Sequence, residues 1–334
     1  MKKILTHLFE SKTFTKEEAY EILTNITSGK YNTSQMAAFM TAYCMRNITV
    51  DELAGFRDAM LDLRLKIDFQ DYKLIDLCGT GGDGKNTFNI STLASFIVAG
   101  AGYPVAKHGN YGVSSGCGSS NVMEYLGYQF SNDSGEIYRS LDEAGICFLH
   151  APLFHPAMKA VAPIRRELGV KTFFNMLGPL VNPAEPIYQS VGVYSLELAR
   201  LYGYLYQRTN KQYSILHALD GYDEISLTGD FKLIGNLGEQ YVSIDRLGFN
   251  KVDAQEIGGG ETVEEAAKIF ITVLSGEGTT AQHNVVLCNA AVAIQTICQQ
   301  KSFADCYYEA EESLFAKKAL NSFNKLVKRE TAVY

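Results

Sequence analysis

Three stretches of this chain combine glycine with polar side chains of the types that bind phosphates or metal ions. Residues 79–92 read GTGGDGKNTFNIST, residues 107–121 read KHGNYGVSSGCGSSN, and residues 220–229 read DGYDEISLTG. Glycine-rich loops bind phosphates because glycine lets backbone N–H groups approach the anion closely. The question is therefore which phosphate these stretches bind and what reaction it undergoes.

The first stretch matches two familiar glycine motifs, and each match is incomplete. A P-loop requires Ser or Thr after its lysine, whereas Lys85 is followed by asparagine and Asp83 would face the phosphates. A dinucleotide-binding motif requires its helix to begin within the glycine run and an acidic residue on the next strand. Here the helix is expected to begin near Ser91, and the next strand ends in Lys107 and His108. Both interpretations are therefore disfavoured.

The polar run Asn89, Ser91 and Thr92 offers a different anion site, at the N-terminus of the expected helix. That end of a helix carries free N–H groups and the positive end of the helix dipole. The alternative is that Asn89 or Ser91 only caps the helix. Because a cap accounts for one of these residues and not for the whole run, we favour an anion site.

The second stretch repeats this arrangement, because it also follows a predicted strand, is rich in glycine and serine, and ends at a predicted helix. It also supplies a cation, Lys107. Loops at the carboxyl ends of neighbouring parallel strands face one crevice, where ligands bind in open α/β sheets. The two stretches together predict a large ligand that carries several phosphates.

The third stretch contains two adjacent carboxylates, Asp223 and Glu224. In isolation, such a pair after a strand is more often a solvated turn than a metal site. Opposite a polyphosphate, the same pair can hold Mg²⁺ that is bridged to the substrate. Spacing alone leaves both alternatives open.

The elements that position these stretches are of two kinds. The first 65 or so residues are predicted to be helical, with capping boxes at Thr15/Glu18 and Thr49/Glu52. From about residue 73, short apolar runs alternate with helical patterns, which predicts an α/β domain with a largely parallel sheet. Strands are expected at 73–78, 104–110, 145–152, 213–221 and 242–249, and helices at 34–45, 91–102, 119–128, 155–170 (opened by Pro156), 262–276 and 284–300.

The overall composition argues against several classes of protein. The chain has 334 residues and a net charge of −7 without a basic run, which argues against nucleic-acid binding. No apolar run reaches the ~18 residues of a membrane span, and the N-terminal apolar stretch is too short for a signal peptide. The seven cysteines are scattered and never spaced C-x-x-C, which argues against disulfides or zinc and favours the cytoplasm.

The three stretches, in this order, resemble the anthranilate phosphoribosyltransferase family. The motifs KHGN and GYDE, the late VLCNAA and the long block from Phe148 to Pro183 match the family's pattern. The resemblance implies a small N-terminal α-helical domain and a larger α/β domain of the nucleoside phosphorylase type, with a mainly parallel central sheet. It places these domains at residues 1–66, joined by helices from about 156–180, and at residues 67–334.

The resemblance also implies the reaction. Anthranilate is coupled to phosphoribosyl pyrophosphate (PRPP), which gives N-(5-phosphoribosyl)anthranilate and pyrophosphate in tryptophan biosynthesis. The implied cofactor is Mg²⁺, with two ions per subunit, and the implied assembly is a homodimer formed through the helical domain. The aryl amine of anthranilate is unprotonated at neutral pH, so alignment of the substrates suffices. No residue is therefore assigned as a general base or a nucleophile.

The same resemblance assigns roles to particular residues. PRPP would be bound by Gly79, Gly82, Asp83, Thr87, Asn89, Ser91, Thr92, Lys107, Ser115 and Ser119. Anthranilate would be bound by Gly79, Asn110 and Arg165. The forked guanidinium of Arg165 suits the carboxylate of anthranilate. Magnesium would be bound by Ser91, Asp223 and Glu224.

Three residues depart from the family's common pattern. Tyr111 stands where Arg is common, Gly116 where Lys is common, and Asn121 where Asp is common. Losing two cations near a phosphate would weaken PRPP binding or mark a divergent member. Because Lys107, Asn110 and both carboxylates remain, we interpret the departures as variation and expect the activity to be retained.

Two rival functions make different demands on the sequence. A pyrimidine nucleoside phosphorylase shares the fold, but it would show a K-H-S-type loop in place of KHGN and would lack the carboxylate pair. A relative that binds nucleic acid would need a basic surface, which a pI near 5.5 contradicts.

Overall fold

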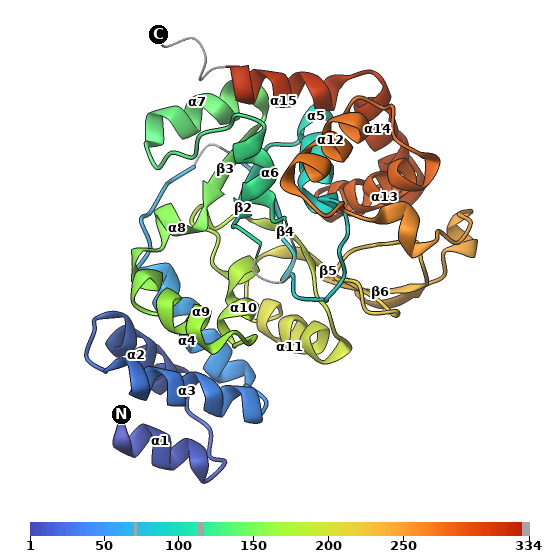
Figure 1. Cartoon of the computed structure of the whole chain (residues 1–334). Helices are drawn as coiled ribbons and strands as arrows, with labels where there is room; N and C mark the ends of the chain where they lie inside the picture. The colour runs from blue at the N-terminus through green and yellow to red at the C-terminus, as the bar shows by residue number, and fades with distance from the viewer. Residues whose placement is uncertain (70–71, 113–116, 329–334) are drawn as a thin grey trace. The chain divides into compact units, whose positions relative to one another are not determined.

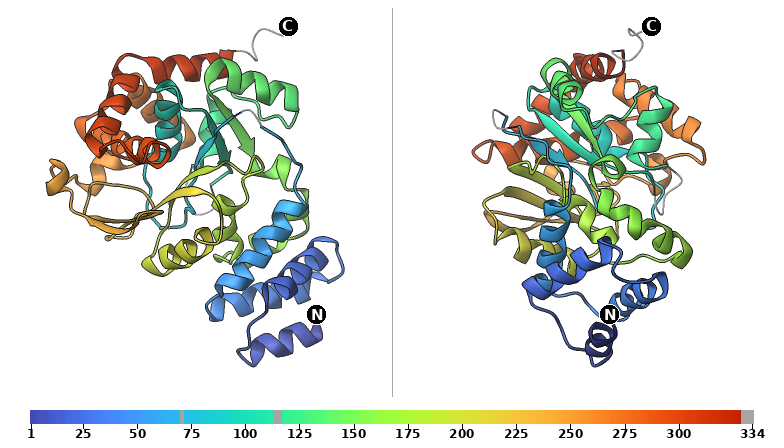
Figure 2. Two further views of the ribbon diagram at one scale, coloured as in Figure 1. Left: turned by 180° about the vertical axis from the view of Figure 1, so that it is seen from behind. Right: turned by 90° about the vertical axis from the view of Figure 1, so that its left-hand side faces the viewer.

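The chain divides into two compact units (Figures 1 and 2). The structure is a computed structural model that describes residues 1–69, 72–112 and 117–328. The helical unit comprises Met1–Ile67 and Ala151–Glu185, and the α/β unit comprises Asp68–His150 and Pro186–Tyr334. In the described part of the chain, no helix is long and apolar enough to cross a membrane.

The helical unit is built around an aromatic core. Phe39, Phe56 and Phe173 are buried, and the ring centroids of Phe56 and Phe173 lie 4.6 Å apart in a stacked arrangement. Because Phe173 comes from the second segment of the chain, the core joins both segments of the unit. Its elements are α1 (Lys2–Phe9), α2 (Lys16–Thr27), α3 (Thr33–Met45), α4 (Val50–Asp62), α8 (Ala151–Phe154), η1 (Pro156–Ala160), α9 (Ala162–Leu168), α10 (Phe174–Leu177) and η2 (Gly178–Leu180).

The single helix expected over 155–170 is wrong in detail. The segment forms the 3₁₀ helix η1, which Pro156 opens as expected, and then a separate α-helix, α9, with Pro163 in its first turn. Proline lacks the N–H that a continuous helix would need, and its ring clashes with the carbonyl four residues earlier. A helix can therefore restart at Pro163 but cannot run through it.

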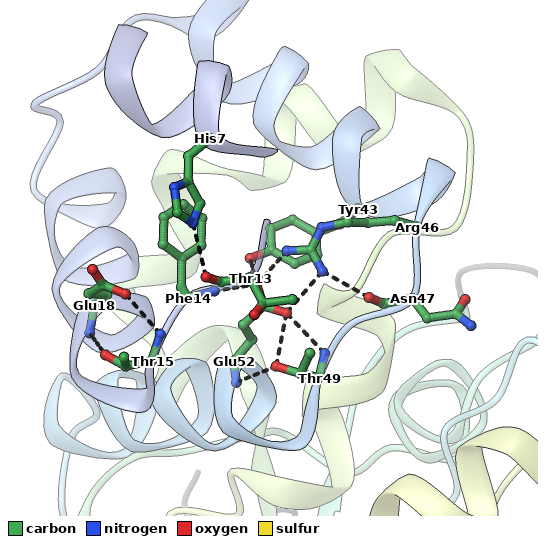
Figure 3. A network of polar contacts seen from close by, with 10 residues as sticks. All are labelled: His7, Thr13, Phe14, Thr15, Glu18, Tyr43, Arg46, Asn47, Thr49 and Glu52. Carbon is green, nitrogen blue, oxygen red and sulfur yellow. Dashed lines mark hydrogen bonds and ion pairs between the residues drawn. The ribbon is translucent and has the colours of Figure 1, made fainter. Parts of the chain in front are cut away.

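Both predicted capping boxes are confirmed, and they differ in burial. Thr15 and Glu18 begin α2 at the surface, whereas Glu52, which caps α4 with Thr49, has a fully buried side chain. Figure 3 shows the second box as the centre of a polar network. The Glu52 carboxylate accepts hydrogen bonds from Phe14 N (3.1 Å), Tyr43 Oη (3.0 Å) and Thr49 N (2.9 Å), and it forms an ion pair with Arg46.

This difference predicts unequal effects of one isosteric change. Glu52→Gln keeps an oxygen for the cap but leaves the Arg46 charge unpaired, so we expect a loss of about 3 kcal/mol in the free energy of unfolding. The control Glu18→Gln, at the exposed box, should change it by less than about 0.5 kcal/mol. Urea denaturation followed by circular dichroism measures both, and equal losses would contradict a special role for the buried pair.

The α/β unit contains one seven-stranded sheet in the order β3-β2-β1-β4-β5-β6-β7. The strands β1 to β5 pair in parallel, which confirms the predicted mainly parallel sheet. The strands are β1 (Ile75–Leu77), β2 (Val105–Gly109), β3 (Ile146–His150), β4 (Tyr188–Gly192), β5 (Gln212–Ala218), β6 (Phe231–Gly235) and β7 (Gly238–Val242). The helices are α5 (Ile90–Gly100), α6 (Ser119–Tyr125), α7 (Ser134–Ala144), α11 (Leu196–Tyr206), α12 (Val263–Leu274), α13 (Thr280–Ile297), α14 (Phe303–Phe315) and α15 (Lys318–Lys328), with short 3₁₀ helices η3 (Asp245–Leu247) and η4 (Ala254–Ile257).

The strand expected at 242–249 is a second correction. The strand β7 ends at Val242, and a 3₁₀ helix covers Asp245–Leu247. In the antiparallel β6–β7 hairpin, Val242 pairs with Phe231, the first residue of β6. Among the residues that the structure describes, no strand pairs with the chain beyond Val242, and Ile244 N instead donates to the Asp230 carboxylate at 3.0 Å.

Candidate active site

The first polar stretch begins where the order of the sheet reverses. The central strand β1 pairs with β2 on one side and with β4 on the other. Just beyond the carboxyl end of β1, the loop is hydrogen-bonded to the end of β4: Thr80 N donates to Gly192 O at 2.9 Å. This is the topological switch point, where open α/β sheets bind their ligands.

The two carboxylates of the third stretch hold backbone N–H groups of the first. The Asp223 Oδ2 atom accepts from Gly81 N at 2.7 Å, and the Glu224 Oε1 atom accepts from Ser91 N at 2.9 Å. A side chain on Gly79 would lie 2.7 Å from Asp223 Oδ2, so that glycine gives the carboxylate its space. The structure therefore brings Asp223 and Glu224 together with the predicted phosphate loop.

The side chain at the N-cap position of α5 makes no capping hydrogen bond to the helix. Asn89 occupies the N-cap position, but its amide Nδ2 donates to Cys117 O at 3.4 Å, which links the first polar stretch to the second. The hydroxyl of Thr92 is buried and has no hydrogen-bond partner among the described residues. A helix N-terminus with an orphaned buried hydroxyl is suited to a phosphate.

The rest of the first stretch is held by a distant segment of the chain. Thr87 forms an isolated antiparallel bridge with Gly258, and Asn86 Nδ2 donates to Gly260 O at 2.8 Å. Asp83 accepts from Lys85 N at 2.9 Å, and Gly82 adopts a positive φ of 76°. These contacts fix the loop that carries the predicted PRPP ligands.

In the second stretch, Lys107 and Asn110 differ sharply in exposure. Lys107 is buried, and its ammonium donates to Leu77 O, at the end of β1, at 2.6 Å. Asn110 is exposed, and its backbone O accepts from Ser119 Oγ at 3.3 Å and from Ser120 N at 3.2 Å. The predicted PRPP ligand Ser115, like the departure Gly116, lies outside the described residues.

The electrostatics of the carboxylate pair fit a divalent cation. Burial raises the pKa of Asp223, and the nearby Asp83 charge raises it further. Burial also raises the pKa of Glu224, and the Asp223 charge raises it further. Among the described residues no three His, Cys, Asp or Glu side chains form a metal cluster. Mg²⁺ commonly takes one or two protein carboxylates and completes its shell with substrate phosphates and water, so the pair suits this ion.

Arg165 lies in the helical unit, on α9. Its Nη2 donates to Asn175 Oδ1 at 3.5 Å, and its guanidinium carbon lies 5.5 Å from the centroid of the Phe174 ring. Burial lowers the pKa of Arg165, and in the described parts of the chain no carboxylate pairs with it. A half-buried cation to which no described carboxylate pairs fits the predicted contact with a substrate carboxylate, and that role stays a prediction.

Two of the departures from the family pattern have clear local contacts. Asn121 Oδ1 accepts from Gly112 N and Gly118 N, both at 3.0 Å, so an amide oxygen performs what a carboxylate oxygen could do there. The Tyr111 side chain reaches Glu124 with its hydroxyl at 3.4 Å. These contacts hold the described ends of the loop against α6.

Sequence reasoning missed two residues that support the carboxylate pair. A side chain on Gly192 would lie 1.4 Å from Asp223 O, so only glycine fits at the end of β4. The Asn289 side chain, buried on α13, bonds both Ile225 N (3.1 Å) and Ile225 O (2.9 Å), immediately after Glu224. The available signal was a lone asparagine within the apolar run VVLCNAAVAI.

Comparisons with known proteins show which family this chain is similar to. Residues 2–63 match the glycosyl transferase family, helical bundle domain, and residues 71–320 match the glycosyl transferase family, a/b domain. The anthranilate phosphoribosyltransferase of Christiangramia forsetii is 57% identical over 98% of this chain and 99% of its own length. That of Flavobacterium psychrophilum is 59% identical, with 98% of both chains covered.

This chain belongs to the anthranilate phosphoribosyltransferase family.

Solved structures of the family have the same fold. The anthranilate phosphoribosyltransferase of Thermus thermophilus superposes with a TM-score of 0.91 at 30% identity, covering 98% of this chain and 99% of that chain. The Saccharomyces cerevisiae enzyme in complex with PRPP and Mg gives a TM-score of 0.91 at 26% identity, covering 99% and 98%. The fold predicted from the sequence is thereby confirmed.

In this family member, the raised pKa values of Asp223 and Glu224 predict how stability depends on pH. Both groups bind protons more tightly when folded, so their contribution to stability decreases as the pH rises above the ordinary carboxyl pKa of about 4. We expect the melting temperature in chelator to fall between pH 6.5 and 8.5, and Mg²⁺ to restore more of it at the higher pH. Glu224→Gln should flatten the dependence in differential scanning calorimetry, and an unchanged slope would contradict the assignment.

The close approach at Gly79 predicts opposite results for two glycine substitutions. Gly79→Ala would push its methyl group against the Asp223 carboxylate, and we expect a loss of about 1–3 kcal/mol in the free energy of unfolding. Gly203→Ala is the control, because its methyl group would lie 3.7 Å from Ile234 Cγ2, inside α11. It should be neutral or stabilising by up to about 1 kcal/mol. Denaturant titration decides, and a tolerated Gly79→Ala would mean that the carboxylate is free to move.

Proposed function

We propose that this chain transfers the phosphoribosyl group of PRPP to the amine of anthranilate, giving N-(5-phosphoribosyl)anthranilate and pyrophosphate in tryptophan biosynthesis. The observation that carries the proposal is the meeting of Asp223 and Glu224 with the N–H groups of Gly81 and Ser91 at the switch point of the sheet. The yeast relative in complex with PRPP and Mg, and another structure of it with 4-fluoroanthranilate, support both substrates.

The phosphate end of PRPP is assigned to the first two polar stretches. The N-terminus of α5, with the orphaned Thr92 hydroxyl, offers donors and a positive dipole end to one phosphate. Gly79 and Gly82 are proposed to contact the sugar phosphate through their backbone, and Lys107 and Ser119 complete the set on the second stretch. Ser91, Asp223 and Glu224 are proposed to hold Mg²⁺, two ions per subunit, which when bound neutralises the charge of the leaving pyrophosphate.

The acceptor end of the reaction requires positioning rather than acid–base chemistry. The aryl amine of anthranilate has a free lone pair at neutral pH, so the chain has to align it with the ribose carbon and exclude competing water. Asn110 and Arg165 are proposed to do this, with the Arg165 guanidinium binding the carboxylate. We also propose that the protein works in the cytoplasm as a homodimer formed through the helical unit.

Removing the metal or its ligands tests the proposal. Phosphoribosylanthranilate is fluorescent, so its formation can be followed on mixing protein, PRPP, Mg²⁺ and anthranilate. We expect turnover to stop in EDTA and to fall at least about 100-fold in Asp223→Asn/Glu224→Gln, because charge stabilisation at the leaving group is lost. The matched double variant Asp230→Asn/Glu239→Gln carries the same two exchanges, one immediately before β6 and one on β7, and should keep full activity. Full activity in the first double variant would remove the carboxylates from the mechanism.

A further inference from the structure

A buried histidine that the proposed mechanism does not use lies next to the KHGN loop. His150 is the last residue of β3, the strand that pairs with β2, and its register partner is Gly109, the last residue of β2 and part of the KHGN motif. Its side chain is 4% exposed. Burial lowers the pKa of His150 to about 4, so the imidazole is neutral at the pH of the cytoplasm.

The His150 ring is fixed by contacts on two of its sides. Phe130 stacks on it with ring centroids 4.4 Å apart and planes inclined by 20°, and Tyr111 meets it edge to face at 4.9 Å. Offset and edge-to-face aromatic contacts of this kind have defined geometry and limit rotation of the ring. Because Tyr111 follows Asn110 directly, one of these contacts acts on the loop itself.

A short series of hydrogen bonds connects this ring to the backbone of Asn110. The His150 Nδ1 atom and Ser120 Oγ are 2.9 Å apart. Ser120 N in turn donates to Asn110 O at 3.2 Å, and the Asn110 side chain accepts from Tyr111 N at 2.8 Å through Oδ1. The side-chain amide of Asn110 is thereby left with its Nδ2 donors for another partner.

We propose that His150 is a positioning residue for anthranilate, acting through Ser120 and Tyr111 to hold Asn110 in the conformation that binds the substrate. The inference rests on the proposed function, and it assigns to the ring no contact with either substrate. Tyr111, which stands where the family commonly has arginine, then has a role of its own. It packs the loop onto an aromatic ring instead of supplying a charge.

Two substitutions at one position separate the contributions of the ring. His150→Phe keeps the aromatic stack and removes the nitrogen that faces Ser120, whereas His150→Asn places an oxygen near the Nδ1 position and removes the stack. We expect His150→Phe to raise KM for anthranilate about fivefold and KM for PRPP less than twofold. The rise in KM for anthranilate, relative to the wild type, should be at most half as large in His150→Asn as in His150→Phe.

Ser120→Ala tests the same link from its other end with a smaller change in packing. It should raise KM for anthranilate about as much as His150→Phe, and the double variant should be no worse than either single one, because both remove one interaction. These expectations remain testable even if the histidine variants fold poorly. The wild-type turnover assay tests the proposed function separately from this comparison of variants.

His283→Phe is the matched control. His283 is also buried in the α/β unit, accepts from Gly278 N at 3.1 Å and packs edge to face on Phe315, and neither partner belongs to the KHGN motif. It should lower the melting temperature without changing either KM. An unchanged KM for anthranilate in both His150→Phe and Ser120→Ala, or equal rises in both KM values, would overturn the proposal.

Discussion

The structure of the candidate site depends on holding two adjacent carboxylates, the buried Asp223 and the half-buried Glu224, beside each other. Burial raises the pKa of both groups, the Asp83 charge raises that of Asp223 further, and the Asp223 charge raises that of Glu224 further. Both accept hydrogen bonds from backbone N–H groups, Asp223 from Gly81 and Glu224 from Ser91. Because those N–H groups belong to the loop after β1 and to the start of α5, the acidic pair and the phosphate loop hold each other in place.

Much of the fold follows from local signals in the sequence. The capping boxes at Thr15 and Thr49 begin helices as predicted, because a cap is made within four consecutive residues. The strand β1 and the helix α5, which flank the first polar stretch, were predictable because each is encoded by a short continuous run of apolar residues. The β6–β7 hairpin was not, because β7 is mostly exposed and its segment GEQYV has no apolar alternation. The strand mistakenly expected at 242–249 came from apolar residues that pack outside the sheet.

The candidate site was predictable as a set of motifs but not as a set of contacts. The motifs carry the chemistry, so Asp223, Glu224, Ser91 and Lys107 could be named from their types and from family resemblance. That Gly192 must be glycine depends on the carbonyl of Asp223, which is distant in sequence. The burial of Lys107 against the end of β1 is equally a property of the folded chain. Close contacts between residues that are distant in the sequence produce no pattern of periodicity or composition from which they could be predicted.

The order in which the strands are synthesised has a consequence for the nascent protein. The central strand β1 leaves the ribosome early, but its partner β4 follows only after the second segment of the helical unit, Ala151–Glu185. Until Tyr188–Gly192 emerges, one edge of β1 has no partner, and unpaired edges of this kind invite pairing with other chains. The helical unit, in contrast, has all its residues by Glu185. The helical unit can therefore begin to fold on the ribosome before β4 is available to pair with β1.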